Sequence, residues 1–144
     1  MVEYRILPEQ GLMLIFVWGT TSAEEIFGLS ERLRGDPAFS PAYEALVDNT
    51  YLEHPPAGVA LRELAEPRLP TARPDSKLAV IAPADAAYGA SRMHQLLTES
   101  RSPLHIGVFR DTHSALEWLG KTDMGVEGVL DEIRGTILAS RKDC

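Results

Sequence analysis

Hydrophobic and polar residues follow one another along the chain in patterns that predict strands and helices in succession. Two β-rich runs, residues 2–7 and 12–18, flank a turn that contains Pro8 and Gly11. We therefore expect an antiparallel hairpin at the start of the chain. The second run is apolar throughout, which is typical of a strand that is buried on both faces.

A helix is predicted directly after the hairpin. Ser22 and Glu25 have the spacing of a capping box, in which each residue satisfies a free backbone donor of the first turn. Ile26, Leu29 and Leu33 then fall on one helical stripe. Gly35 and the following Asp-Pro pair are expected to end the helix.

The middle of the chain continues the alternation. Residues 43–48 read as a third strand, 49–56 as a turn-rich loop and 57–66 as a helix. Three prolines at 67, 70 and 74 predict an irregular connector. Residues 78–82 are wholly apolar, which indicates a central parallel strand.

The last third predicts three more helices around a fifth strand at residues 104–109. The first helix has Asp85 as its expected N-cap and a core-facing stripe of Ala86, Ala90, Met93 and Leu97. The second is capped by Asp111 or Thr112 and turns Ala115, Leu116 and Leu119 inward. The third carries Val126, Leu130, Ile133 and Ile137 on one stripe.

This order predicts an α/β fold with a mixed sheet of about five strands. The hairpin supplies an antiparallel edge, the other strands are mostly parallel, and helices pack on the sheet. We expect one α/β domain over residues 1–120, followed by an amphipathic helical extension over 121–144. The stripe of that extension must be buried, either on its own domain or on another copy.

Composition and charge narrow the classes of function. The chain has 144 residues and 14 basic against 21 acidic side chains, a net charge of −7. This balance argues against nucleic acid and anionic membranes as partners. Cys144 is the single cysteine, which fits a reducing, cytoplasmic location. The run 12–18 is shorter than the roughly 20 residues of a transmembrane helix and lacks the basic leader of a signal peptide.

Several segments together resemble the SpoIIAA-like branch of the STAS, or anti-sigma-factor antagonist, superfamily of small bacterial proteins. The resemblance covers about residues 1–120. It rests most on Tyr88-Gly89-x-x-Arg92-Met93 and on Phe109-Arg110-Asp111 followed by Ala115-Leu116-x-Trp118-Leu119. It implies a non-catalytic, cofactor-free regulatory module that binds a protein partner or a small apolar, lipid-like ligand.

One departure from the family pattern concerns phosphorylation. Anti-sigma antagonists carry a phosphorylatable serine in a turn after the third strand, whereas this chain reads Asp48-Asn49-Thr50 there. No serine lies between Ser40 and Ser76. The sequence therefore does not predict a serine switch at this position.

The carboxyl ends of the parallel strands are the expected binding crevice of such a sheet. We predict that a ligand is bound there by residues of the strand ends and the helices that follow them: Asp48, Thr50, Tyr51, Tyr88, Arg92, Arg110, Asp111 and Trp118. The alternative interpretation is structural. Asp85 and Asp111 would then be helix caps, and Arg92 and Arg110 would pair with acids at the rim.

Two other classes of function stay open at this point. One is a small hydrolase or transferase that uses Asp85, His113 and Arg110; the other is a structural homodimer built on the last helix. The sequence has no Gly-x-Ser-x-Gly elbow, and its four histidines are scattered without metal-ligand spacing. We therefore expect no catalytic centre, no metal and no cofactor.

Overall fold

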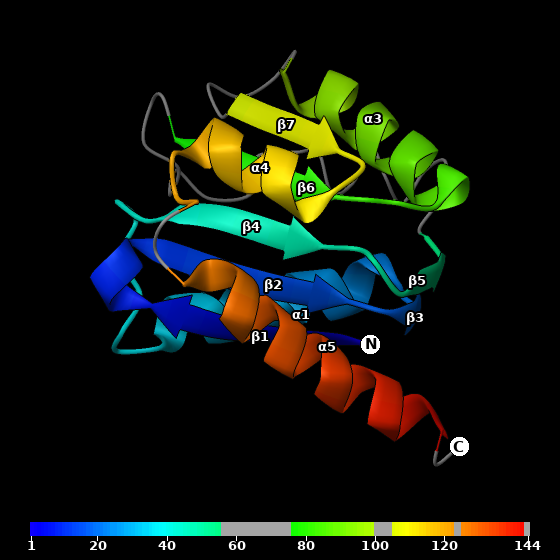
Figure 1. Ribbon diagram of the computed structural model, residues 1–144, viewed down its shortest axis with the longest axis horizontal. Coiled ribbons are helices and arrows are strands. Elements are labelled where there is room, and N and C mark those ends of the chain that lie inside the picture. Colours follow the sequence, from blue (N-terminus) through cyan, green and yellow to red (C-terminus); the bar gives the residue numbers. More distant parts are fainter. Residues whose placement is uncertain (56–75, 100–104, 123–124, 143–144) are drawn as a thin grey trace.

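The computed structural model describes residues 1–55, 76–99, 105–122 and 125–142 (Figure 1). The helix expected at 57–66 and the proline-rich connector after it lie outside these residues.

A five-stranded sheet forms the centre of the molecule, in the order β1-β2-β4-β6-β7. Its strands are β1 (Val2–Leu7), β2 (Leu12–Val17), β4 (Glu44–Asp48), β6 (Lys77–Ile81) and β7 (His105–Phe109). β1 and β2 are antiparallel, and the other three pairings are parallel. The predicted hairpin is confirmed: a 3-10 turn, η1 (Pro8–Gln10), joins the two strands, and Gly11 closes it at φ 61°.

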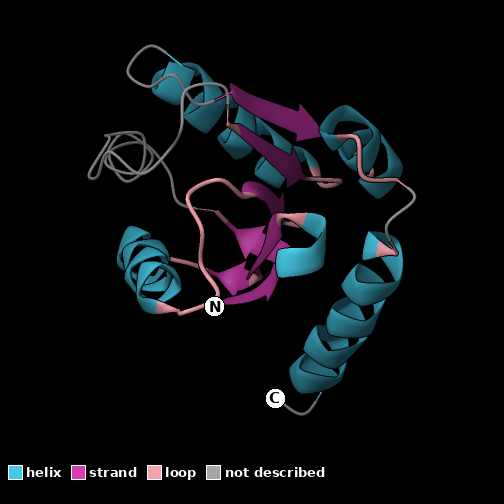
Figure 2. Ribbon diagram, turned by 90° about the vertical axis from the view of Figure 1, so that its left-hand side faces the viewer, coloured by secondary structure: helices cyan, strands magenta, loops and turns pink. Residues whose placement is uncertain are grey.

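Helices cover both faces of the sheet. They are α1 (Ala23–Gly35), α3 (Asp85–Glu99), α4 (Thr112–Leu119) and α5 (Val126–Lys142). Figure 2 shows the sheet edge-on, with α1 and α3 on one side and α4 and α5 on the other. The predicted mixed α/β architecture is therefore confirmed, including the C-terminal helix.

The alternating side chains of the strands divide the core between the two faces. Leu12, Leu14 and Phe16 of β2 are buried in one cluster with residues of α4 and α5. Met13 packs on the opposite face with Leu33 of α1. Both faces of β2 are thus covered, as its unbroken apolar run predicts.

The C-terminal helix packs on its own chain. Val126, Leu130 and Ile137 of α5 lie in the same buried cluster as the inward residues of β2 and α4. In Figure 1, α5 crosses in front of β1 and β2 and runs beyond them at its carboxyl end. The predicted stripe is therefore the face that α5 turns toward the sheet.

A second, two-stranded sheet was not predicted. β3 (Gly19–Thr20) and β5 (Leu52–His54) pair in parallel beyond the ends of β2 and β4. Gly19 has a φ of 66°, which suits glycine. Strands of two and three residues are too short to show a period of two, so the sequence predicts only the start of a helix near residue 20 and a loop over residues 49–56.

The expected inward face of α3 was wrong. Ala87, Ser91 and Thr98 are buried, whereas Met93 is 52% exposed and Ala86 also faces solvent. The buried hydroxyls have partners: Ser91 Oγ accepts from Asn49 Nδ2 at 3.2 Å, and Thr98 Oγ1 lies 3.4 Å from His94 Nε2. Small side chains let the helix approach the sheet closely. Hydrophobic periodicity could not identify this face, because two of its three buried residues, Ser91 and Thr98, are polar.

Candidate functional site

The carboxyl ends of the strands carry two polar groups on opposite faces of the sheet. β4 illustrates the division, because Asp48 points toward α4 and α5 and the next residue, Asn49, points toward α3. The residues predicted to line one crevice are therefore not all brought together.

The first group is centred on the carboxylate of Asp48, which is 3% exposed. Arg134 of α5 donates from Nε to Oδ2 at 2.7 Å and from Nη2 to Oδ1 at 3.2 Å. The same Nη2 donates to Thr112 Oγ1 at 2.9 Å. Thr50 donates to Asp48 Oδ1 through its backbone N–H at 3.2 Å and also through its hydroxyl. Tyr51 packs against the neighbouring apolar cluster.

Arg134 was missed by the sequence analysis. Burial alone would lower the pKa of its guanidinium, but the hydrogen bond and the charge of Asp48 together raise that pKa above its ordinary value. The signal in the sequence is one arginine near the apolar stripe of an amphipathic helix, and nothing local identifies its partner 86 residues away. The ion pair between Asp48 and Arg134 therefore covers the carboxyl end of β4 on this face of the sheet.

The second group lies at the start of α3. Arg110 donates to Asp85 Oδ1 at 2.7 Å, and its guanidinium lies 4.8 Å from the centre of the Tyr88 ring. Asp85 is the first residue of α3 rather than its expected N-cap, and its carboxylate is 96% exposed. This corner is an open surface with one cation stacked on an aromatic ring.

Asp111 is confirmed as the N-cap of α4. Its carboxylate accepts from the backbone N–H of Ser114 at 2.8 Å and from the Ser114 hydroxyl at 2.9 Å. These two hydrogen bonds hold the pKa of the Asp111 carboxyl below its ordinary value. Its geometry is that of a helix cap, which agrees with the structural interpretation.

Two of the predicted ligand-binding residues lie apart from this corner. Arg92 is exposed on α3, and its guanidinium donates to Gln95. Trp118 was expected as a wall of the crevice, but it lies beside Lys77 at the start of β6 and Gly107 in the middle of β7. There it accepts a hydrogen bond from Lys77 Nζ at its backbone oxygen, at 3.2 Å, and its ring packs against Phe109. An eight-residue helix that starts at the carboxyl end of a strand returns its last turn to the other end, which the sequence argument overlooked.

The residues of the alternative hydrolase do not form one site in the described part of the chain. Asp85 is bound to Arg110, whereas His113 Nε2 lies 3.4 Å from Glu117 on the same helix. His113 and Glu117 are both well exposed. The described residues hold no group of three or more histidine, cysteine, aspartate or glutamate side chains placed to bind a metal ion.

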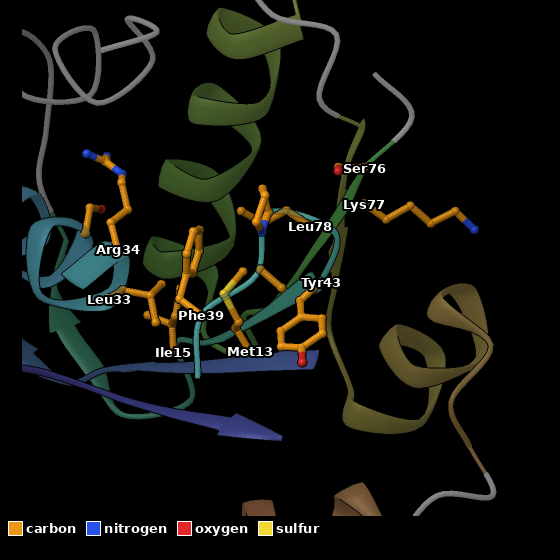
Figure 3. Close-up of a pocket in the computed structure, with 12 residues that line it drawn as sticks. Met13, Ile15, Leu33, Arg34, Phe39, Tyr43, Ser76, Lys77 and Leu78 are labelled. Atoms are coloured by element: carbon orange, nitrogen blue, oxygen red, sulfur yellow. The ribbon is translucent and has the colours of Figure 1, made fainter. Parts of the chain in front are cut away.

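An apolar cavity of about 180 Å³ lies on the face of the sheet that carries α1 and α3. Its lining is mostly aliphatic and aromatic: Met13, Ile15, Leu33, Phe39, Tyr43, Ala45 and Leu78, with Ser30, Arg34, Pro41, Ser76 and Lys77 completing it. Figure 3 shows Phe39, Met13, Leu33 and Ile15 grouped together, and Arg34 and Lys77 reaching out of the lining on opposite sides.

Two inner strands are less buried at the cavity than their apolar sequences predict. Ile15 is the only residue of β2 that is not buried, and Leu78 in β6 is also only half-buried. Both positions point to the stretch of sheet between α1 and α3. Periodicity shows which residues face inward but not where a cavity forms among them, so this site could not be predicted from the sequence.

The outward face of α3 is a third feature. Met93 is 52% and Leu96 59% exposed. Ala86 and Gly89 are exposed beside them. We call these four residues the α3 strip. They form a continuous apolar line along one side of the helix, because they differ by three, four and three positions.

A hairpin edge, parallel central strands and helices on both faces define a SpoIIAA-like α/β fold, which confirms the fold that the sequence resemblance implied. A solved structure similar to this chain is that of an uncharacterized protein from the DUF3478 family, with a SpoIIAA-like fold, from Shewanella loihica PV-4. The two chains are 20% identical, with a TM-score of 0.54 over 82% of this chain and 93% of the other. The sequence matches no protein-family model and no curated protein. Among the described helices, none has the length and apolar character needed to cross a bilayer.

Proposed function

We propose that this chain is a non-catalytic, STAS-like binding module that holds a small apolar ligand in the cavity between α1 and the sheet. The observation that carries the proposal is the set of partly exposed apolar side chains on inner strands. Ile15 and Leu78 belong to β2 and β6, each of which has a neighbouring strand on both sides. Apolar side chains at such positions are normally covered, and a ligand seated in the cavity would cover them.

The volume of the cavity limits the size of the ligand. Engineered apolar cavities of about 150 Å³ bind benzene, and pockets for drug-sized molecules measure about 300 Å³ or more. At about 180 Å³, this cavity fits one small ring or a short acyl chain. A lipid with two long chains would not fit inside it.

Methyl NMR on methionine-labelled protein tests the proposal, because Met13 lines the cavity and Met93 lies on the α3 strip. A neutral probe, 3-phenylpropanol, should shift the Met13 methyl signal in a saturable way and leave Met93 unchanged. At a hundredfold excess over its dissociation constant, it should stabilise the fold by about 2.7 kcal/mol. An unmoved Met13 signal at saturating probe would contradict the proposal.

A cavity-filling variant provides the control. Ala45 is buried on the lining, so Ala45→Leu should fill the cavity and abolish the shift of Met13. Ala42→Leu makes the same change at an exposed position three residues earlier and should bind as the unaltered chain does. If Ala45→Leu does not fold, Ile15→Phe fills the same cavity from β2.

A protein partner is the second candidate, favoured by the α3 strip and the adjoining corner of Tyr88 and Arg110. Exposed apolar strips of this kind mark interaction surfaces when they are contiguous. The same labelled sample distinguishes the two candidates: a purified partner should shift Met93 and leave Met13 in place. Leu96→Glu should weaken that binding at least tenfold, and a partner whose affinity is unaffected by Leu96→Glu would exclude the α3 strip.

A further inference from the structure

The charges around the cavity differ in sign from those of the chain as a whole. The net charge of the chain is −7, yet both charged residues of the described lining, Arg34 and Lys77, are basic. The described lining contains no carboxylate. A small anion at its mouth would therefore meet basic side chains and no opposing acid within the described lining.

The two basic residues are not equivalent. Lys77 Nζ donates to the backbone oxygen of Trp118 at 3.2 Å and lies 5.2 Å from the centre of its ring. Its charge is therefore turned away from the cavity, as Figure 3 also shows. The guanidinium of Arg34 makes no hydrogen bond or ion pair with any residue in the described part of the chain. Its stem lines the cavity while its guanidinium lies outside the lining.

The nearest acid along the chain does not neutralise Arg34. Asp36 accepts from the Tyr4 hydroxyl at 2.8 Å and from the backbone N–H of Ala38 at 2.9 Å. These two hydrogen bonds lower the pKa of the Asp36 carboxyl and occupy both of its oxygens, one with Ala38 of the same turn and one with Tyr4 of β1. The neighbouring cation, Arg32, is stacked 5.9 Å from the ring centre of Tyr4. Arg34 is thus the basic side chain at the cavity that is available to a ligand.

We propose that the ligand is a small monocarboxylate whose apolar body enters the cavity and whose carboxylate is bound by Arg34. This inference rests on the proposed function and adds the chemical class of the ligand. A planar guanidinium matches a carboxylate through two parallel hydrogen bonds. A ligand with one negative charge is favoured over a ligand with several, because the cavity offers one unpaired arginine and the chain as a whole has a net charge of −7. The volume limits the body to about one ring with a short linker.

Three probes of the same size and different charge test this assignment on the full chain. They are 3-phenylpropanoate, 3-phenylpropanol and 3-phenylpropylammonium, titrated by calorimetry and by the Met13 methyl signal. The carboxylate should bind roughly tenfold more tightly than the alcohol, and the ammonium most weakly. Arg34→Met should remove the advantage of the carboxylate and leave the affinity of the alcohol unchanged. Arg32→Met is the matched control and should alter neither.

The results of these titrations distinguish a wrong ligand class from a wrong proposed function. If the alcohol binds as tightly as the carboxylate, or if Arg34→Met weakens both equally, the assigned ligand class is overturned and the apolar site stands. If none of the three probes moves the Met13 signal, the proposed function itself is overturned. Arg34→Lys keeps the positive charge but loses the two parallel donors of the guanidinium, so it should retain only part of the preference for the carboxylate.

Discussion

Replacing Arg134 with methionine tests how the C-terminal helix is held. The long apolar stem of the side chain is largely preserved, so the change removes mainly the charge and the hydrogen bonds. What remains is the Asp48 carboxylate, 3% exposed, with Thr50 as its donor. Removing one partner of a buried ion pair typically costs about 3–5 kcal/mol. For a chain of this size, that loss corresponds to a fall in Tm of roughly 6–20 °C.

Urea unfolding followed by tryptophan fluorescence measures the free energy of unfolding of each variant. Arg92→Met is the matched control, because Arg92 is exposed and, among the described residues, its guanidinium bonds to a side chain of its own helix; we expect a change within about 0.5 kcal/mol. Asp48→Asn keeps the shape and the acceptor but removes the buried charge. The double variant Asp48→Asn/Arg134→Met should therefore be more stable than Arg134→Met alone.

A loss of less than about 1 kcal/mol in Arg134→Met would refute this role of the ion pair, since a buried carboxylate without a counter-charge costs more than that. This role is also refuted if Asp48→Asn does not recover any of the lost stability. In that case the two substitutions act independently and the contact adds no coupling energy.

Three further substitutions probe local features. Gly107→Ala should cost about 1–3 kcal/mol and change the near-UV circular dichroism, because its Cβ would lie 2.7 Å from the Phe109 ring; an unchanged spectrum would refute the clash. Carboxyl NMR should show that the pKa of Asp111 lies below the ordinary aspartate range, so the stability from its cap is present above that range and is lost as pH falls through the lowered pKa. Ser114→Ala should raise this pKa, and an unchanged pKa would mean that the Ser114 hydroxyl does not lower it. Ser22→Ala should cost about 1 kcal/mol in urea unfolding, and no loss would mean that its bond to Glu25 N–H is not stabilising.

The elements that were predictable from the sequence are those whose signals are local. The N-cap at Ser22, the N-cap at Asp111 and the apolar runs of β2 and β6 each depend on residues within a few positions of one another. The resemblance of the Tyr88 and Phe109 segments added the overall topology. These are the parts of the fold that the structure confirms.

The candidate site was less predictable because it depends on packing across the chain. Asp48 and Trp118 were expected at one crevice, but α4 carries Trp118 away from the strand end where Asp48 lies, and it is Asn49 rather than Asp48 that turns toward α3. Arg134 contributes to the strand ends from the last helix, and the cavity is formed by residues of β2, α1, β4 and β6 that are distant in the sequence. None of these relations leaves a periodic or motif signal near the residues concerned.

The placement of α5 also bears on the order in which the protein is made. Leu12 and Phe16 leave the ribosome early, yet their covering partners on one face, Leu130 and Ile137, are more than a hundred residues later in the chain. Contacts of such long sequence separation form late, and apolar surface that waits for them is exposed to chaperones and to aggregation. The nascent chain can therefore complete its core only after the segment that contains α5 has been synthesised.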